Sequence, residues 1–156
     1  MINQFICVSS DSGNIPAINV ALFRLENNIW ALNKGTRHKG KFSTGSKIVI
    51  YTAGTRYNSR KFIGKATVRD IVEFNRRHIK RYTKPTWTCT LPDLALELND
   101  VIKFDNFVDI YTIKNDMDLF HDLKSNNWGS RLQGGVTLIS KSDYKMIIKS
   151  SGKNYN

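Results

Sequence analysis

The sequence predicts an α+β fold built around a curled, mixed β-sheet. Short apolar runs typical of strands are separated by helical patterns at irregular intervals, which argues against the regular alternation of a doubly wound parallel sheet. The chain has 156 residues, of which 40% are hydrophobic, so it is long enough to bury a core. We therefore expect one domain over residues 1–156, ordered from about residue 4 to residue 150.

The expected strands come from short apolar or β-branched runs bounded by polar residues. They cover residues 4–9, 29–32, 47–52, 61–68 and 136–139, with one or two more in 94–104 and a further extended piece in 107–111. The polar loop from Gly54 to Arg60 suits a hairpin between two of them.

Four helices are expected from apolar spacing and capping residues. Asn14 can cap the first, which takes Pro16 in its first turn and ends at Asn27. Residues 70–82 form the second, because Ile71, Phe74, His78 and Tyr82 fall on one stripe. The third covers 116–124 and buries Leu119, Phe120 and Leu123. Ser140, with Asp143 three residues later, opens the fourth, which buries Tyr144, Ile147 and Ile148.

Positive charge is concentrated in one third of the chain. The net charge is +11, and residues 34–84 hold 15 of the 24 basic residues but two of the 13 acidic ones. Such segregation indicates a polyanion, most often nucleic acid, although a solvated basic face would give the same pattern. The expected contacts to a nucleic-acid backbone are Lys34, Arg37, Lys39, Lys41, Arg56, Arg60, Arg76, Arg77, Lys80, Arg81 and Lys84.

Catalytic and metal-binding patterns are missing from the sequence. Cys7 and Cys89 stand alone, and the three histidines lack the partners of a metal site, so we expect no metal, no cofactor and no enzymatic activity. Cys7, in a buried strand, should be unreactive, and His78 should be a packing residue. No apolar run reaches the roughly 18 residues of a membrane span, so we expect a cytoplasmic protein with no membrane partner.

Two tryptophans, Trp30 and Trp87, lie at the edges of the basic segment. Aromatic side chains beside Arg and Lys suit base stacking combined with phosphate contact. Trp128 lies outside the segment and is interpreted as structural.

Several segments in order resemble the EVE domains of the PUA-like superfamily and the related YTH domains. They are Phe-Ile-Cys-Val-Ser-Ser (5–10), Asn-Ile-Trp-Ala-Leu-Asn (28–33), Gly-Ser-Lys-Ile-Val-Ile-Tyr (45–51) and Phe-Ile-Gly-Lys-Ala-Thr-Val (62–68). The C-terminal part adds Asn-Trp-Gly-Ser-Arg-Leu-Gln-Gly-Gly-Val (127–136), Ile139 and Asp143-Tyr144. Together the resemblance covers residues 5–149.

The resemblance implies a PUA-like curled mixed β-barrel flanked by helices, with a pocket for one extruded modified base. YTH domains read N6-methyladenine in RNA, and EVE domains are associated with modified bases and often occur beside modification-dependent restriction nucleases. The implied base is 5-methylcytosine, 5-hydroxymethylcytosine or N6-methyladenine in DNA, with a nuclease domain or subunit of a prokaryotic defence system as a partner. The implied pocket residues are Trp30, Trp87, Ser9, Ser10, Asp11, Asn14, Ala31, Asn33, Tyr51 and Thr52.

Three other functions stay open at this stage. One is an RNA-binding PUA-like module that reads modified RNA. Another is a small PUA-like hydrolase, for which Lys34 and Asp11 are the pair that could act. The last is a basic adaptor for proteins or membranes.

Overall fold

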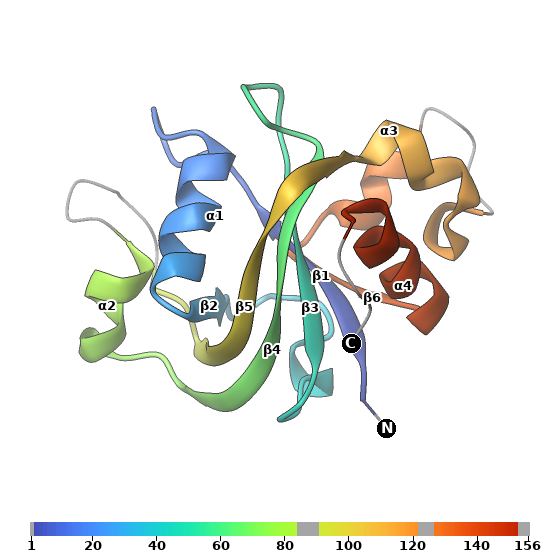
Figure 1. The fold of residues 1–156 in the computed structure, drawn as a ribbon. Coiled ribbons are helices and arrows are strands. Elements are labelled where there is room, and N and C mark those ends of the chain that lie inside the picture. The colour runs from blue at the N-terminus through green and yellow to red at the C-terminus, as the bar shows by residue number, and fades with distance from the viewer. Residues whose placement is uncertain (1, 84–90, 122–126, 153–156) are drawn as a thin grey trace.

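The computed structural model describes residues 2–83, 91–121 and 127–152. Six strands within these ranges form one curled sheet in the order β2-β5-β4-β3-β1-β6 (Figure 1). They are β1 (Gln4–Ser9), β2 (Ile29–Leu32), β3 (Lys47–Thr52), β4 (Lys61–Glu73), β5 (Leu94–Asp109) and β6 (Val136–Ile139). β1 is parallel to β3 and the other pairings are antiparallel, so the predicted mixed sheet is confirmed.

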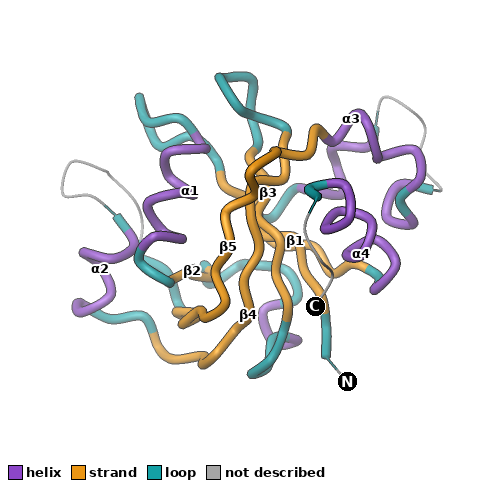
Figure 2. Tube along the Cα trace, viewed as in Figure 1, coloured by secondary structure: helices purple, strands orange, loops and turns teal. Residues whose placement is uncertain are grey.

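Helices cover the two ends of the sheet (Figure 2). They are α1 (Ala17–Glu26), α2 (Arg76–Tyr82), α3 (Ile110–Ile113) and α4 (Lys141–Ser150). α1 and α2 lie beside β2 and β5, whereas α3 and α4 lie on the side of β6. No helix in the described ranges is long and apolar enough to cross a membrane.

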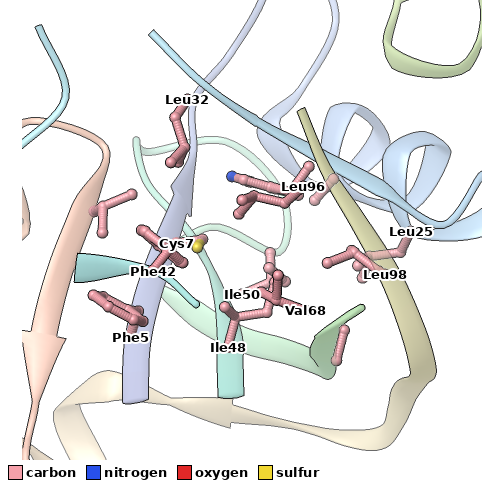
Figure 3. Close-up of a cluster of buried hydrophobic side chains, with 14 of the residues drawn as sticks. Phe5, Cys7, Leu25, Leu32, Phe42, Ile48, Ile50, Val68, Leu96 and Leu98 are labelled. Carbon is pink, nitrogen blue, oxygen red and sulfur yellow. The ribbon is translucent and has the colours of Figure 1, made fainter. Parts of the chain in front are cut away.

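The curled sheet encloses a hydrophobic core (Figure 3). Phe5 and Phe42 stack within it, with ring centroids 3.8 Å apart, and Trp30 and Leu25 pack into the same cluster. A second cluster joins the outer face of β1, β3 and β4 to α4, and a third anchors α2 on β2 and β5. Cys7 is fully buried, and this burial raises the pKa of its thiol, as expected for an unreactive cysteine.

The strands of residues 4–9, 29–32, 47–52 and 136–139 are confirmed at both ends. The last helix is also confirmed: the backbone N–H of Asp143 donates to Ser140 Oγ at 3.0 Å, and Tyr144, Ile147 and Ile148 are buried. Local signals alone therefore predict elements whose buried face is continuous.

The predicted helix over 70–82 is wrong in its first half. β4 continues to Glu73, and its residues from Asp70 onward pair with Leu94–Glu97 of β5. α2 begins only at Arg76, where Asn75 Oδ1 accepts from the Arg77 N–H and His78 Nδ1 accepts from the Asn75 N–H. Cross-strand pairing of β-branched residues has overridden an apolar spacing that also fits a helix.

Residues 94–109 form one long strand, β5, rather than separate pieces. Shifts of register against β4 bend the pair, and one of them lies at Gly64. A Cβ placed on Gly64 would lie 2.7 Å from the carbonyl oxygen of Ile102, so only glycine permits this close approach. The bulges let a single pair of strands curl around the core.

The predicted helix over 116–124 is replaced by single 3₁₀ turns, Lys114–Asp116 and Asp118–Phe120, after the unpredicted α3. The buried Asp143 of α4 accepts from the backbone N–H groups of Asp118 and Leu119 at 2.7 and 2.9 Å. A side chain from another element therefore satisfies these N–H groups. Leu123 lies outside the described residues.

Candidate nucleic-acid interface

A cavity of about 620 Å³, which we call cavity 1, opens where β1 and β2 end. Its walls come from the β1–α1 junction, α1, β2 and the segment after it, α2, and the segment before β6. Its lining includes Ser10, Asp11, Arg24, Trp30, Ala31, Asn33, Tyr82, Gly134 and Gly135.

Aromatic rings and an arginine form one wall of cavity 1. Trp30 and Tyr82 are 2% and 6% exposed, so each presents only part of its ring. The Cζ atom of Arg24 lies 3.7 Å from the Tyr82 ring centroid and 5.5 Å from that of Trp30. Its Nε donates to the Tyr82 carbonyl at 3.3 Å. This arrangement is a cation–π stack, in which another flat, electron-poor group can take the place of the guanidinium over the rings.

Asp11 shapes the polar side of cavity 1. The Ala17 N–H at the start of α1 donates to Asp11 Oδ1 at 2.8 Å, and Oδ2 lies 3.5 Å from Nε of Arg56. Asn14 is exposed and makes no cap, so the predicted capping role belongs to Asp11. The junction is therefore fixed from both sides before any ligand binds.

Five of the predicted pocket residues meet in cavity 1: Ser10, Asp11, Trp30, Ala31 and Asn33. Others do not line it. Ser9 is buried and its Oγ donates to the Ala17 carbonyl at 2.8 Å, and Thr52 Oγ1 donates to the Asn58 carbonyl at 2.7 Å. Tyr51 lines a different cavity, and Trp87 lies outside the described residues.

Arg24, Tyr82 and the Gly134-Gly135 segment were missed by the sequence reasoning. Tyr82 was assigned to the apolar stripe of a longer helix. Arg24 carried a usable signal, since it is the one basic residue among the first 33. A lone arginine at the end of a helix facing a Trp-containing strand is a pattern worth testing for a pocket.

A second cavity of about 580 Å³, which we call cavity 2, abuts the first. The two share Val8, Ser10, Gly134 and Gly135, and the Val8 N–H donates to the Gly135 carbonyl at 2.8 Å in this common wall. The remaining lining of cavity 2 includes Tyr51, Arg60, Tyr111, Trp128 and Gln133. Burial raises the pKa of the Tyr51 phenol, so its hydroxyl stays protonated.

The predicted backbone-contact residues divide into two groups. Lys34 and Arg37 are exposed beside Asn33 and Thr36 of cavity 1, and Lys41 is exposed farther along the same loop. Exposed positions on α2 are Arg76, Arg77 and Lys80. Lys39 Nζ instead lies 2.5 Å from Asp93, and Arg56 pairs with Asp11. Lys84 lies outside the described residues.

Arg81, one of the predicted backbone contacts, is partly exposed and pairs with Glu97. Its two terminal nitrogens donate to the Glu97 carboxylate at 2.6 and 2.7 Å, and the guanidinium also donates to the carbonyls of Asn27 and Asn28. These bonds hold the pKa of Glu97 below its ordinary value. His78 is buried beside the pair, as predicted for a packing residue, and burial lowers its pKa although Glu97 opposes this.

Metal-ligating side chains lie apart from one another in the described part of the chain. Within residues 2–83, 91–121 and 127–152, no three His, Cys, Asp or Glu side chains gather as a metal site would require. The pair considered for a hydrolase is not assembled either, because Asp11 lines cavity 1 and Lys34 does not.

No protein-family model and no curated protein matches the chain. Solved structures do share its fold. Human THYN1, in complex with DNA containing 5-methylcytosine, has a TM-score of 0.61 at 8% identity over 97% of this chain and 99% of that one. ASCH from Zymomonas mobilis has a TM-score of 0.61 at 11% identity over 94% of each chain. The MmI1 YTH domain has a TM-score of 0.56 at 15% identity over 94% of this chain and 92% of that one.

The chain has a PUA-like fold. The curled mixed sheet and the near-complete coverage of these three structures establish it. Because no family model matches the chain, its assignment to the EVE domains among the PUA-like folds stays a prediction.

Proposed function

We propose that this protein is a non-catalytic reader that extrudes one modified base from DNA and holds it in cavity 1. The observation that carries the proposal is the wall formed by Trp30, Tyr82 and Arg24, in which the arginine covers two nearly buried rings at a cavity open to the surface. The PUA-like fold shared with THYN1, which was solved with 5-methylcytosine DNA, supports it. The volume of about 620 Å³ falls within the ~300–1,000 Å³ common for small-ligand sites.

Stacking and edge contacts must together offset the cost of extrusion. Removing a base from a duplex costs a few kcal/mol, and stacking on an aromatic side chain returns about 1–3 kcal/mol. An added methyl group contributes about 0.8 kcal/mol when buried. The rest of the discrimination requires matched hydrogen bonds, for which Ser10, Asp11 and Asn33 are the exposed polar side chains of the cavity.

Arg24 closes the slot over Trp30 in this structure. A base stacked between two flat groups needs about 3.5 Å on each face, so roughly 7 Å between them. The Arg24 Cζ atom is 5.5 Å from the Trp30 ring centroid, which is too close. The arginine side chain therefore swings away as the base enters, and its guanidinium then donates to the edge of the base.

Affinity would come mainly from basic residues around cavity 1. Lys34 and Arg37 are exposed along one rim, and Arg76, Arg77 and Lys80 are exposed on α2, which also carries Tyr82. Phosphate contacts of this kind make binding fall steeply with salt. A nuclease domain or subunit, as in a restriction or defence system, would then act on the DNA that the reader marks.

Reading of modified RNA is the second candidate, favoured by the likeness to the MmI1 YTH domain. The same cavity would serve, because a nucleobase has the same stacking face in either polymer. A requirement for the 2′-hydroxyl in competition with matched DNA would distinguish the two.

Fluorescence anisotropy at about 150 mM salt tests the proposal, since nonspecific affinity is already reduced there. Matched DNA and RNA duplexes carry unmodified cytosine or adenine, 5-methylcytosine, 5-hydroxymethylcytosine or N6-methyladenine. We expect one modified base to bind at least about tenfold tighter, from its buried methyl group together with matched hydrogen bonds. Equal binding across the panel would contradict the reader function.

The variants must spare the core, because Trp30 is 2% exposed and packs into it. Trp30→Phe keeps an aromatic ring of smaller area, and Asn33→Ala removes an exposed polar group from cavity 1. Both should reduce the preference for the modified base while leaving salt-sensitive binding to unmodified DNA. Tyr57→Ala is the matched control, since Tyr57 is 83% exposed and lines neither cavity.

A further inference from the structure

Cavity 2 is a feature that the reading of one base does not use. It has nearly the volume of cavity 1 and shares a wall with it, built from the end of β1 and the Gly134-Gly135 segment. Both glycines have positive φ angles, of 91° and 85°, and no atom lies within 4 Å of where a Cβ would be. The wall shared by the two cavities therefore consists of main chain alone at Gly134-Gly135, with Val8 and Ser10 beside it.

Two aromatic rings are held at fixed angles on the other side of cavity 2. Trp128 packs edge-to-face with Tyr111, with centroids 5.4 Å apart and planes at 80°, and also with Phe120 at 6.0 Å. Tyr111 is nevertheless 47% exposed, which is unusual for a large ring in a packed cluster. Such a ring, fixed in orientation and open to solvent, is suited to stacking against a flat ligand.

Arg60 is fixed at the mouth of cavity 2. Its Nε donates to the Gly54 carbonyl at 3.1 Å, and Nη1 donates to the Tyr111 hydroxyl. Its backbone has a φ of 60°, in the left-handed region that an arginine adopts less readily than glycine. The main chain is held in this conformation by the Ile110 N–H, which donates to the Arg60 carbonyl at 3.1 Å.

The charge around cavity 2 favours an anion. Among the described residues its lining contains Arg60 and no acidic residue, and Lys114 Nζ lies 5.9 Å from the Trp128 ring centroid. Two acidic residues lie nearby, each beside a basic side chain. Asp109 is 3.5 Å from Lys61 Nζ and accepts from the Tyr111 N–H, and Asp11, next to Gly54, is 3.5 Å from Nε of Arg56. Gln133 and Ser10 add neutral polar side chains to the lining.

We propose that cavity 2 binds the nucleotide next to the base held in cavity 1. Its base stacks on the exposed ring of Tyr111, which Trp128 holds by edge-to-face packing, and its phosphate pairs with Arg60. This inference rests on the proposed function, because cavity 2 takes the neighbour of the base that cavity 1 holds. The wall shared by the two cavities makes them adjacent, as two consecutive nucleotides require. A flat base with an attached phosphate matches an aromatic surface beside a fixed guanidinium better than an apolar ligand would.

A double-mutant cycle between protein and nucleic acid tests this. The probe is a short single-stranded DNA with one central modified base, prepared with 5-methylcytosine, 5-hydroxymethylcytosine or N6-methyladenine. In parallel strands the base on the 5′ or the 3′ side is replaced by an abasic spacer that keeps the phosphate. We expect wild-type protein to lose about tenfold in affinity with one of the two spacers, the value of one stacked base.

Tyr111→Ala should bind the intact strand about tenfold more weakly than wild type does. On the sensitive spacer strand, its affinity should equal that of wild type, because the stacked base is already missing. Tyr57→Ala, which removes an exposed tyrosine outside both cavities, should behave as wild type. Thermal unfolding of each variant confirms that the fold is kept. Arg60→Gln should weaken binding to both intact and spacer strands, because the phosphate is still present.

Failure of this inference is distinguishable from failure of the proposed function. If neither spacer weakens binding, or if Tyr111→Ala and the spacer lose affinity additively, cavity 2 holds no neighbouring base, whatever cavity 1 does. If the spacer effect is present but the modified and unmodified strands bind equally, the reader function fails and the inference fails with it, since its first nucleotide is undefined.

Discussion

Arg81 provides the sharpest test of how the basic residues divide between folding and binding. Replacing it with methionine keeps an unbranched apolar stem but removes the paired contacts to Glu97 and the bonds to the carbonyls of Asn27 and Asn28. Because Arg81 is 34% exposed and Glu97 13% exposed, the stranded carboxylate is partly hydrated. The loss should therefore lie at or below the ~3–5 kcal/mol of a buried pair, at about 2–3 kcal/mol.

Urea unfolding and salt-dependent binding together measure this prediction. Arg81→Met should lower the free energy of unfolding by that amount, and it should leave the slope of log affinity against log salt unchanged. The exposed Arg76→Gln and Arg77→Gln should do the reverse, changing stability by less than about 0.5 kcal/mol and lowering the slope by about one per contact. A reduced salt slope in Arg81→Met without loss of stability would refute the structural role.

Three further predictions follow from the same contacts. Arg81 lowers the pKa of Glu97, so the folded state gains stability above the carboxyl's ordinary range near 4 and loses it as pH falls through the lowered value. Urea midpoints in that acidic window should therefore fall in wild type but less in Glu97→Gln; equal acid sensitivity would contradict this. Asp11→Ala should lower the free energy of unfolding by about 1 kcal/mol, because α1 loses its cap, whereas Asn14→Ala should lower it by under 0.5 kcal/mol. The opposite order in thermal unfolding would show that Asn14 is the cap. Trp30→Ala should lose roughly 3–5 kcal/mol of stability and Trp30→Phe much less, so a fully stable alanine variant would show that Trp30 is not part of the core.

The fold was predictable wherever burial is continuous along the chain. The strand of residues 136–139 and the helix opened by Ser140 have an apolar face and a cap in sequence, so they could be placed at their ends. Residues 70–73 could not, because the apolar spacing there fits a helix and only pairing with β5, far along the chain, selects a strand. The bend at Gly64 likewise depends on a carbonyl of another strand.

Five lining residues of cavity 1 could be predicted, Trp30 already from its place beside the basic segment and the others through the resemblance to EVE and YTH domains. Trp30, Ser10 and Asn33 lie in the segments that carry it. Tyr82 and Arg24 come from helices, whose residues show their burial pattern in the sequence but not which of them reaches a cavity. The capture of Arg81 by Glu97 was also out of reach, since an exposed and a paired arginine look the same in a basic run.

Extrusion of the base is the central claim, and its dependence on base pairing tests it most directly. The same modified base is presented in a matched pair, opposite a mismatched base and opposite an abasic site, and affinity is measured for each. An extruding reader should bind tighter in that order, because the few kcal/mol spent on unpairing decrease along the series, and Trp30→Phe should weaken all three alike. Affinity that is the same in all three duplexes would show that the base stays stacked and that cavity 1 does not receive it.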